Sequence, residues 1–249
     1  MKGISETVST MIIFSIIIIV VILIFMISFT LLNITTQTSE YGYVKTIFIN
    51  LANSLPEILE GGSYGAQIPS RTIGLGYMEK ENPILIKIAG ELVYSNNPVI
   101  VYAKTFNPMT TVNKTLFGKN SLIVDETILL SRVNEIYING SNYITLDTAR
   151  VFLKKYLYTT ETESRYIVNI IYVRIEPVLL SNQPNRLTVS HAGVNQIIRL
   201  IDLNEFSGDE VLEISSSSGE KYILRKNDFN QANSVFINIR IVSIRVVYM

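Results

Sequence analysis

An apolar run near the start of the chain limits what this sequence can fold into more than any other feature. Residues 11–32 read MIIFSIIIIVVILIFMISFTLL and contain no charge, no proline and no glycine. As a helix the run spans about 33 Å, at about 1.5 Å per residue, and matches a hydrocarbon core of about 30 Å. Lipid requires every backbone polar group to bond within the segment, so we expect a helix despite the isoleucine and valine content. The run predicts one transmembrane span, with the lipid bilayer as its partner.

The flanks of this run predict how it is processed and oriented. The run is longer than the roughly 7–15 apolar residues of a cleaved secretory signal, and no small-residue cleavage site follows, so we expect it to be retained. Lys2 and the terminal amine precede it, opposed by Glu6, and no basic residue follows until Lys45. Basic residues favour the inner side of a membrane. We therefore expect a single-pass cell-membrane protein with a cytoplasmic N-terminus and an extracellular C-terminal domain.

Helical periodicity continues after the span. Apolar residues recur three or four positions apart from Val44 to Leu59, which is the spacing of one helix face. We expect the N-terminal helix to cover residues 4–60, with Pro56 as a candidate kink and Gly61 and Gly62 as its end. Two separate helices are the alternative.

The sequence after this helix has the pattern of strands and turns. Short apolar and aromatic runs alternate with Asn, Gly, Pro and Ser, which predicts a mostly antiparallel, β-sandwich-like extracellular domain over residues 66–249. The fold class is therefore a membrane-anchored α+β protein, and one or two subdomains both fit the β-rich part. The predicted strands are residues 84–89, 99–105, 122–125, 136–138, 166–175, 211–215 and 222–225. A hairpin through the serine-rich residues 216–219 joins the last two.

Two further segments give less direct predictions. Residues 147–157 favour a helix capped by Asp147, although pairing with residues 166–175 is the alternative. At the C-terminus, alternating apolar residues change phase between Ile241 and Val242. A β-bulge there, or a strand crossing from one sheet to another, would keep both apolar sets buried, and a register break at a short loop is the other reading. We expect this strand to be central in its sheet.

Catalytic and metal-binding patterns are scarce. Cysteine is absent and His191 is the only histidine, so a catalytic triad or a zinc site would have to be built around that one residue. The acidic residues between 202 and 213 fail the EF-hand pattern, because Phe206 replaces an oxygen ligand and Ser207 replaces the turn glycine. The glycine loops lack the ending of a phosphate-binding loop. We predict that the protein is not an enzyme and has no cofactor and no metal site.

Charge and glycosylation motifs add two expectations. Lys+Arg and Asp+Glu number 21 each, and this balance predicts no nucleic-acid partner. Glycosylation triplets occur at Asn33, Asn113 and Asn139. Asn33 lies at the membrane edge, so Asn113 and Asn139 are the candidate acceptors.

The residues just before the apolar run carry a short motif. Lys2, Gly3, Ile4 and Glu6 precede the span, and this start resembles the class III signal peptide of archaeal type IV pilins and archaellins over about the first thirty residues. The resemblance implies that residues 1–3 are a leader, that a class III signal peptidase cuts between Gly3 and Ile4, and that Glu6 becomes the third mature residue. It also implies a filament in which the apolar helix packs in the core and the β-rich domain faces outward.

On this resemblance, we expect a pilin-like cell-surface protein. It would be a subunit or minor component of an archaeal type IV pilus-like filament, with other pilin-like subunits as partners and a role in adhesion or surface attachment. Glu6 would pair with the N-terminal ammonium of a neighbouring subunit during assembly. The alternative is a single-span anchored extracellular binding domain that does not polymerise, for which the 14 tyrosines would suit ligand contact as well as strand packing. A membrane-anchored hydrolase would require His191 or paired carboxylates in one cleft.

Overall fold

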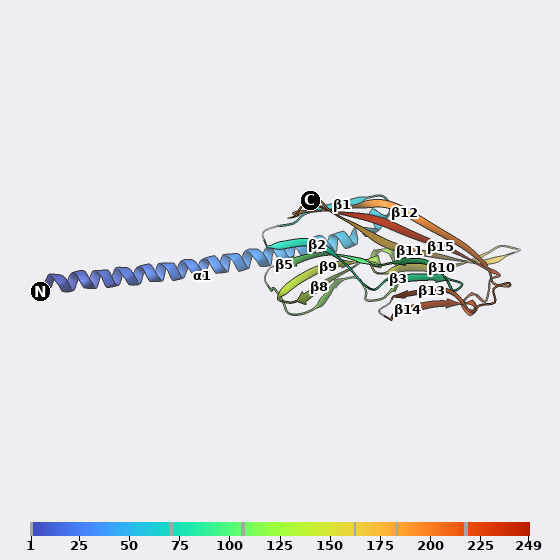
Figure 1. Cartoon of the computed structure of the whole chain (residues 1–249), viewed down its shortest axis with the longest axis horizontal. Helices are drawn as coiled ribbons and strands as arrows, with labels where there is room; N and C mark the ends of the chain where they lie inside the picture. Colours follow the sequence, from blue (N-terminus) through green and yellow to red (C-terminus); the bar gives the residue numbers. More distant parts are fainter. Residues whose placement is uncertain (1, 70–71, 106–107, 162, 183, 217–218) are drawn as a thin grey trace. The chain divides into compact units, whose positions relative to one another are not determined.

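A computed structural model describes the backbone of residues 2–69, 72–105, 108–161, 163–182, 184–216 and 219–249, and the side chains of these ranges from residue 8 onward. The chain divides into two compact units, Met1–Tyr43 and Val44–Met249. Helix α1 (Lys2–Asn53) makes up the described part of the first unit and contributes its last residues to the second (Figure 1).

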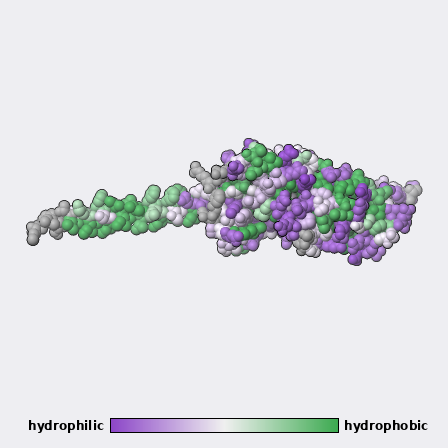
Figure 2. Space-filling view, viewed as in Figure 1, coloured by the Kyte–Doolittle hydropathy of each residue, from purple (hydrophilic) through white to green (hydrophobic). Residues whose placement is uncertain are grey.

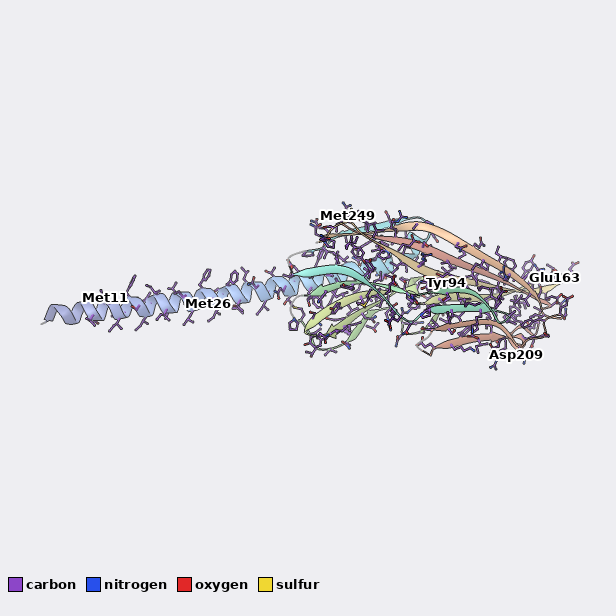
Figure 3. The ribbon with its side chains drawn as sticks, viewed as in Figure 1. Met11, Met26, Tyr94, Glu163, Asp209 and Met249 are labelled. Carbon is purple, nitrogen blue, oxygen red and sulfur yellow. The ribbon has the colours of Figure 1, made fainter. Side chains whose placement is uncertain are left out.

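The first unit is an apolar helix whose side chains are exposed. Large apolar residues from Val8 to Ile34 lie open along α1, including Phe25 with 70% of its surface exposed, and they form the apolar surface in Figure 2. Figure 3 shows their side chains, with Met11 and Met26 labelled. Ser15 and Thr30 each donate a hydroxyl hydrogen bond of 2.8 Å to the carbonyl four residues earlier, so these polar groups are satisfied within the helix. The helix is long and apolar enough to cross a membrane, as the sequence predicted.

The helical region ends in two steps. A short helix, α2 (Leu55–Leu59), follows α1, and the break falls at Ser54, two residues before Pro56. Gly61 adopts a positive φ of 109°, and the backbone N–H of Gly62 donates to the Glu57 carbonyl at 3.0 Å. This is how glycine commonly closes a helix. The predicted stop at these two glycines is confirmed, and the break before Pro56 gives the two separate helices of the alternative.

The described residues of the second unit form three sheets, and most of their strands are labelled in Figure 1. The six-stranded sheet has the order β1 (Ser63–Gln67), β12 (Arg186–Asp202), β15 (Ser234–Tyr248), β11 (Ser164–Leu179), β10 (Val151–Thr159) and β7 (Ile123–Val124). The five-stranded sheet has the order β2 (Ile73–Glu79), β5 (Val99–Thr105), β9 (Ser141–Asp147), β8 (Arg132–Ile138) and β6 (Lys114–Phe117). The four-stranded sheet has the order β14 (Lys221–Arg225), β13 (Glu210–Ser216), β3 (Ile84–Ile88) and β4 (Glu91–Asn96).

Two short 3₁₀ helices, Thr127–Leu130 and Lys226–Phe229, complete the elements of this unit. Strand pairs are antiparallel except for β11 with β15 and β7 with β10, which are parallel. The predicted fold class, one long apolar helix followed by a mostly antiparallel β domain, is confirmed. Each of the seven predicted strands coincides with or overlaps an observed one, and the predicted hairpin is the antiparallel pair β13–β14. Residues 217–218 of its turn lie outside the described residues.

The prediction of a helix over residues 147–157 is wrong. Strand β10 covers Val151–Thr159 and pairs antiparallel with β11 from Tyr172 back to Ser164. Val151 and Leu153 point into the core while Lys154 and the residues after it are exposed. The ladder with β11 supplies the backbone hydrogen bonds, so tertiary pairing overrides the weak helical periodicity.

Strand β15 explains the change of apolar phase near the C-terminus. Val235 to Ile241 bury one alternating set of side chains in the core shared with the four-stranded sheet. Val242 to Tyr248 bury the opposite set, and the Tyr248 hydroxyl donates to the Gly76 carbonyl of β2 at 3.0 Å. The first half of β15 is therefore covered on one face and the second half on the opposite face, and the change falls between Ile241 and Val242.

The prediction of a β-bulge between Ile241 and Val242 is wrong. The register between β11 and β15 is continuous through Ile241 and Val242. The bulge lies instead in β12, between His191 and Gly193. The predicted central position is confirmed, because β15 pairs with β11 on one side and β12 on the other.

The end of the helical region packs into the second unit as part of its core. Its buried residues are Val44, Ile47, Phe48, Leu51, Ala52, Leu55, Ile58 and Leu59. Lys45 Nζ lies 2.8 Å from a carboxylate oxygen of Glu135 in β8, and the Tyr64 hydroxyl donates to the Ile47 carbonyl at 3.2 Å. The helical stripe deduced from spacing is thus a buried face.

Candidate functional site: a cationic pocket around Asp147

A buried charged site lies where the chain passes between two sheets. Asp147 is the last residue of β9 in the five-stranded sheet, and Val151 is the first residue of β10 in the six-stranded sheet. The three residues between them make this crossing, and Arg150 is one of them. Asp147 and Arg150 are both almost fully buried.

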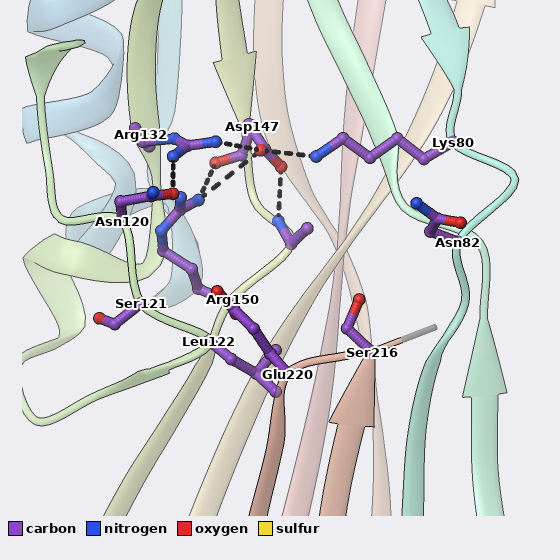
Figure 4. Close-up of a pocket in the computed structure, with 11 residues that line it drawn as sticks. Lys80, Asn82, Asn120, Ser121, Leu122, Arg132, Asp147, Arg150, Ser216 and Glu220 are labelled. Carbon is purple, nitrogen blue, oxygen red and sulfur yellow. Dashed lines mark hydrogen bonds and ion pairs between the residues drawn. The ribbon is translucent and has the colours of Figure 1, made fainter. Parts of the chain in front are cut away.

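Three cationic side chains surround the Asp147 carboxylate (Figure 4). Lys80 Nζ donates to Asp147 Oδ2 at 2.8 Å, and Arg132 Nη2 approaches the same oxygen at 3.3 Å. Arg150 Nη1 lies 3.9 Å from it and donates to the Asp147 backbone carbonyl at 3.1 Å. The other carboxylate oxygen, Oδ1, accepts the Ala149 backbone N–H at 2.9 Å. One carboxylate therefore neutralises part of the charge of three cations.

The remaining donors of the two arginines are held differently. Arg150 Nε donates to the Lys119 carbonyl at 2.9 Å, and Arg132 Nη1 donates to the Asn120 side-chain oxygen. Arg132 Nε is buried and has no hydrogen-bond acceptor. The Nε–H of Arg132 is thus unpaired within a mostly buried side chain.

The electrostatics follow from burial and from these neighbours. Burial alone would raise the pKa of the Asp147 carboxyl, but the charges of Lys80 and Arg150 and the hydrogen bonds from Lys80 and the Ala149 N–H hold that pKa below its usual value. Burial lowers the pKa of the Arg150 guanidinium to about 10, against the attraction of Asp147. The carboxylate is ionised at neutral pH, and the arginine carries its charge in a poorly solvated position.

A pocket of about 150 Å³ opens beside this cluster. Beyond the four residues of this cluster, its polar lining includes Asn82, Asn120, Ser121, Ser216 and the charged Glu220. Within the described part of the chain, no group of three or more His, Asp or Glu side chains is placed to hold a metal ion. Amide, hydroxyl and guanidinium donors suit an anion.

This cluster was missed by the sequence analysis. Asp147 entered it only as a helix cap, and Lys80, Arg132 and Arg150 were not singled out. Lys80 follows β2 and Arg132 begins β8, so their sequence spacing carries no motif. The one local signal for a charged site is the segment Asp147-Thr148-Ala149-Arg150, which places an acidic and a basic residue three positions apart.

The residues predicted from motifs lie elsewhere and are not brought together. Backbone atoms of Lys2, Gly3, Ile4 and Glu6 belong to α1, but their side chains lie outside the described ones. His191 lies beside the β12 bulge, where its Nδ1 is buried without a hydrogen-bond partner.

The two candidate glycosylation sites lie in the five-stranded sheet region. Asn113 is exposed, and its side-chain oxygen accepts the Tyr137 backbone N–H at 2.8 Å. Asn139 and Gly140 form the two-residue turn between β8 and β9, with φ of 50° and 80°. Those values suit a type I′ hairpin turn, for which Asn-Gly is the favoured sequence. Asn139 is therefore exposed at the tip of a hairpin, whereas the Asn113 side chain is held by its hydrogen bond to the backbone of β8.

A second surface of note is one face of the six-stranded sheet. Leu200, Phe236, Ile167 and Tyr156 are register partners across β12, β15, β11 and β10, and none of them is buried. We call the face that carries this row the open face. The next row carries a ladder in which Asn238 donates to Asn169 at 3.1 Å and accepts from Gln196 at 2.8 Å.

The open face contrasts with the other side of the same strands. Neighbouring positions such as Val235 and Val168 are fully buried in the core with the four-stranded sheet. Leu200 exposes 58% of its surface and Tyr156 exposes 45%. Exposed apolar rows of this kind commonly mark interaction surfaces.

Comparison of the chain with protein-family models, with curated proteins and with solved structures finds no match. The description of the protein therefore rests on its own features. Among the residues that the structure describes, one helix near the N-terminus is a candidate membrane span, and a β-rich unit follows it. This arrangement fits a single-pass membrane protein.

Proposed function

We propose that this chain is a pilin-like cell-surface protein, a subunit or minor component of an archaeal type IV pilus-like filament that serves adhesion or surface attachment. The N-terminus lies in the cytoplasm before processing, and the β-rich unit lies outside the cell. The proposal includes no catalytic activity and no cofactor.

One observation carries the proposal: a single helix, α1, has two kinds of surface. Its first part exposes apolar side chains all around, and its last turns bury a stripe in the β-rich unit. A helix of this kind can exchange lipid for the helices of other subunits without disturbing the folded unit, because apolar packing between helices replaces contacts with lipid tails. The start Lys2-Gly3-Ile4 before this helix resembles a class III cleavage site and supports the same reading.

The first experiment is to sequence the N-terminus of the protein recovered from membranes of a host that carries a class III signal peptidase. We expect a mature chain that begins at Ile4. A matched Gly3→Val variant should remain uncut, because the resemblance places cleavage directly after this glycine. A chain that still begins at Met1 or Lys2 in the unmodified protein would contradict the proposed processing.

Assembly needs a separate experiment, because a cleaved chain can still remain a monomer. Electron microscopy of cells producing the protein should show filaments, and Glu6→Ala should abolish them or change the subunit spacing. Glu6 would be costly in an apolar filament interior unless it pairs with the N-terminal ammonium of a neighbour. Glu40→Ala, in the polar part of the same helix, is the control that leaves filaments unchanged. Normal filaments from Glu6→Ala would remove the proposed role of Glu6.

The open face favours a second candidate function, an anchored binding domain that does not polymerise. Leu200, Phe236, Ile167 and Tyr156 form an apolar row on a sheet, and such rows can hold an extended or flat partner. This function predicts that Leu200→Ser and Tyr156→Ser weaken attachment of producing cells to a surface while the protein is still displayed as a monomer. Ile138→Ser, which changes an exposed residue of β8, is the matched control. Unchanged attachment of cells that carry both substitutions, Leu200→Ser and Tyr156→Ser, would exclude the open face as the binding surface.

A further inference from the structure

The six-stranded sheet has a free edge along β12. Strand β1 pairs only with residues 186–190, and among the described residues no strand pairs with the outer side of β12 over residues 193–202. The Ile198 carbonyl in this stretch accepts a hydrogen bond of 3.2 Å from Arg199 Nη1, an exposed contact within one strand. Unpaired backbone groups on a sheet edge are a template for a further strand. We call residues 193–202 the β12 edge.

The opposite side of the same sheet ends in a second free edge. Strand β7 covers only the first two residues of β10, and no other described strand lies along residues 153–159 on that side. Lysines commonly block such edges, but both lysines here make contacts within their own chain. Lys155 Nζ donates to the Asp228 carbonyl at 3.0 Å, and Lys154 Nζ lies 5.4 Å from the centre of the Tyr156 ring. We call residues 153–159 the β10 edge.

Both edges carry exposed apolar side chains on the open face. Leu200 and Tyr156 belong to the row that defines this face, and Ile198 and Tyr158 lie two positions away along the same strands. Side chains at every second position share one face of a strand. Each of the four exposes between 45% and 58% of its surface, so the two edges can cover apolar area on each other.

The directions of the two edges suit a second copy of this chain. Strand β12 runs antiparallel to β15, β15 runs parallel to β11, and β11 runs antiparallel to β10. Strands β10 and β12 therefore point the same way. A copy that is displaced sideways without inversion brings its β10 edge beside the β12 edge as a parallel pair. Copies held in one membrane by the same helix share one orientation towards it, so this displacement keeps both helices in the lipid.

We infer that the β12 edge binds the β10 edge of a second copy of this chain, so that the six-stranded sheet continues from one copy into the next. Each copy still offers one unpaired edge of each kind, so the contact is heterologous and can repeat. It joins β-rich units and does not rest on the proposed filament function, because copies that stay in the membrane can make it.

Charge selects the register of the contact. If equivalent rows were aligned, Arg199 of one copy would lie beside Lys155 of the next, and paired like charges destabilise a sheet. A shift of two residues keeps the faces matched and places Arg199 beside Leu157 instead. In this register, Leu200 lies beside Tyr158 of the next copy on the open face.

The test joins copies through introduced cysteines, because the chain has none of its own. Leu200→Cys and Tyr158→Cys are made in separate full-length proteins, which are incorporated together into phosphatidylcholine vesicles and treated with a short thiol-to-thiol crosslinker. We expect covalent dimers from the mixture and only background from either variant alone. Leu92→Cys, at an exposed residue of β4, is the matched control and should give only background with Tyr158→Cys.

A second arm tests whether the contact repeats. A chain that carries both Leu200→Cys and Tyr158→Cys should give a ladder of crosslinked multimers, because β15 and β11 separate the two positions within one copy. A third arm tests the pairing itself. Ile198→Lys, added to Leu200→Cys, places a charge in the β12 edge and should lower the dimer yield severalfold. Leu92→Lys in the same background is the control, and far-ultraviolet circular dichroism checks that both variants fold.

Three results would overturn the inference. The first is a dimer yield from the mixture that does not exceed the yield with Leu92→Cys. The second is a yield from Leu200→Cys alone equal to that of the mixture, which indicates pairing of two β12 edges. The third is a yield that Ile198→Lys leaves unchanged. None of these results depends on cleavage after Gly3 or on filaments, so they are distinct from a failure of the proposed function.

Discussion

The two parts of helix α1 have the same backbone conformation and opposite surroundings. Between Val8 and Ile34 the large apolar side chains are exposed, and the segment carries no ionisable side chain. From Val44 to Asn53 one face is fully buried in the β-rich unit, and the other carries polar residues such as Lys45 and Asn50. Phe25 exposes 70% of its surface, whereas Phe48 exposes none.

This difference teaches what a hydrophobic pattern can specify. An apolar surface all around a helix requires an apolar solvent or other helices, whereas a stripe every three or four residues requires one packed partner. The same helix therefore depends on two independent sources of stability. Experiments that perturb one source and leave the other unchanged test the comparison directly.

The largest expected effect is on the packed part. Phe48→Ala should lower the free energy of unfolding of the β-rich unit by about 3–5 kcal/mol, because it removes a fully buried aromatic ring and leaves a cavity. Urea denaturation of the full-length protein in detergent, followed by tyrosine fluorescence, measures this. Phe25→Ala makes the same chemical change on the exposed part and should cost less than about 0.5 kcal/mol. Equal losses in the two variants would break the comparison.

A smaller effect is expected from acid, and only in the β-rich unit. The pKa of Asp147 is held below its usual value in the folded protein, so the stabilisation it gives is present above the unfolded pKa of about 3.9 and is lost as the pH falls through the depressed folded pKa. Asp147→Asn should cost about 2–3 kcal/mol at neutral pH, since it weakens the charge-assisted hydrogen bonds that Lys80 and Arg132 donate to the carboxylate.

The pH profile distinguishes this role from a simple packing defect. In the unmodified protein, the urea midpoint should fall steeply below about pH 4, and in Asp147→Asn this fall should be shallower. The far-ultraviolet signal of the apolar helix should persist throughout, because residues 8–34 contain no group that titrates. A profile that is identical in both proteins would contradict the assignment of the acid response to Asp147.

The smallest effect concerns the ion pair that ties the packed part of α1 to β8. Lys45 Nζ lies 2.8 Å from Glu135, whose side chain is largely buried. Lys45→Gln should lower the free energy of unfolding by about 1 kcal/mol, and the loss should shrink in high salt. Lys114→Gln, at an exposed position of β6, is the control. A loss that is equal in both variants, or independent of salt, would count against the pair.

Features with a local pattern could be predicted from the sequence. The apolar run, the stripe from Val44 to Leu59 and the glycines that end it are all encoded within a few turns of one helix. The strands were found because alternation and turn residues are also local. The Asn139-Gly140 turn carries an equally local signal, because Asn-Gly is the favoured sequence of a two-residue hairpin turn.

Features that depend on distant pairing could not be predicted in this way. The strand at Val151–Thr159 is fixed by its ladder with β11, and the face change at Val242 is fixed by which layer covers β15. The Asp147 pocket gathers Lys80, Arg132 and Arg150 from separate elements. Only the order of the strands in the sheets brings these residues together, so their spacing in the sequence does not predict the pocket.

The central place of β15 has a consequence for how the protein reaches its final state. Strand β15 pairs along its whole length with both β11 and β12, and it comes after every other strand in chain order. As the chain is made, β11 and β12 are produced first and must wait for this late strand before their pairing is complete. Long-range pairings of this kind form slowly and leave apolar surface open to wrong contacts. In a single-pass membrane protein, which the apolar helix fits, that helix would tether each unfinished domain and limit its encounters with other nascent chains during this interval.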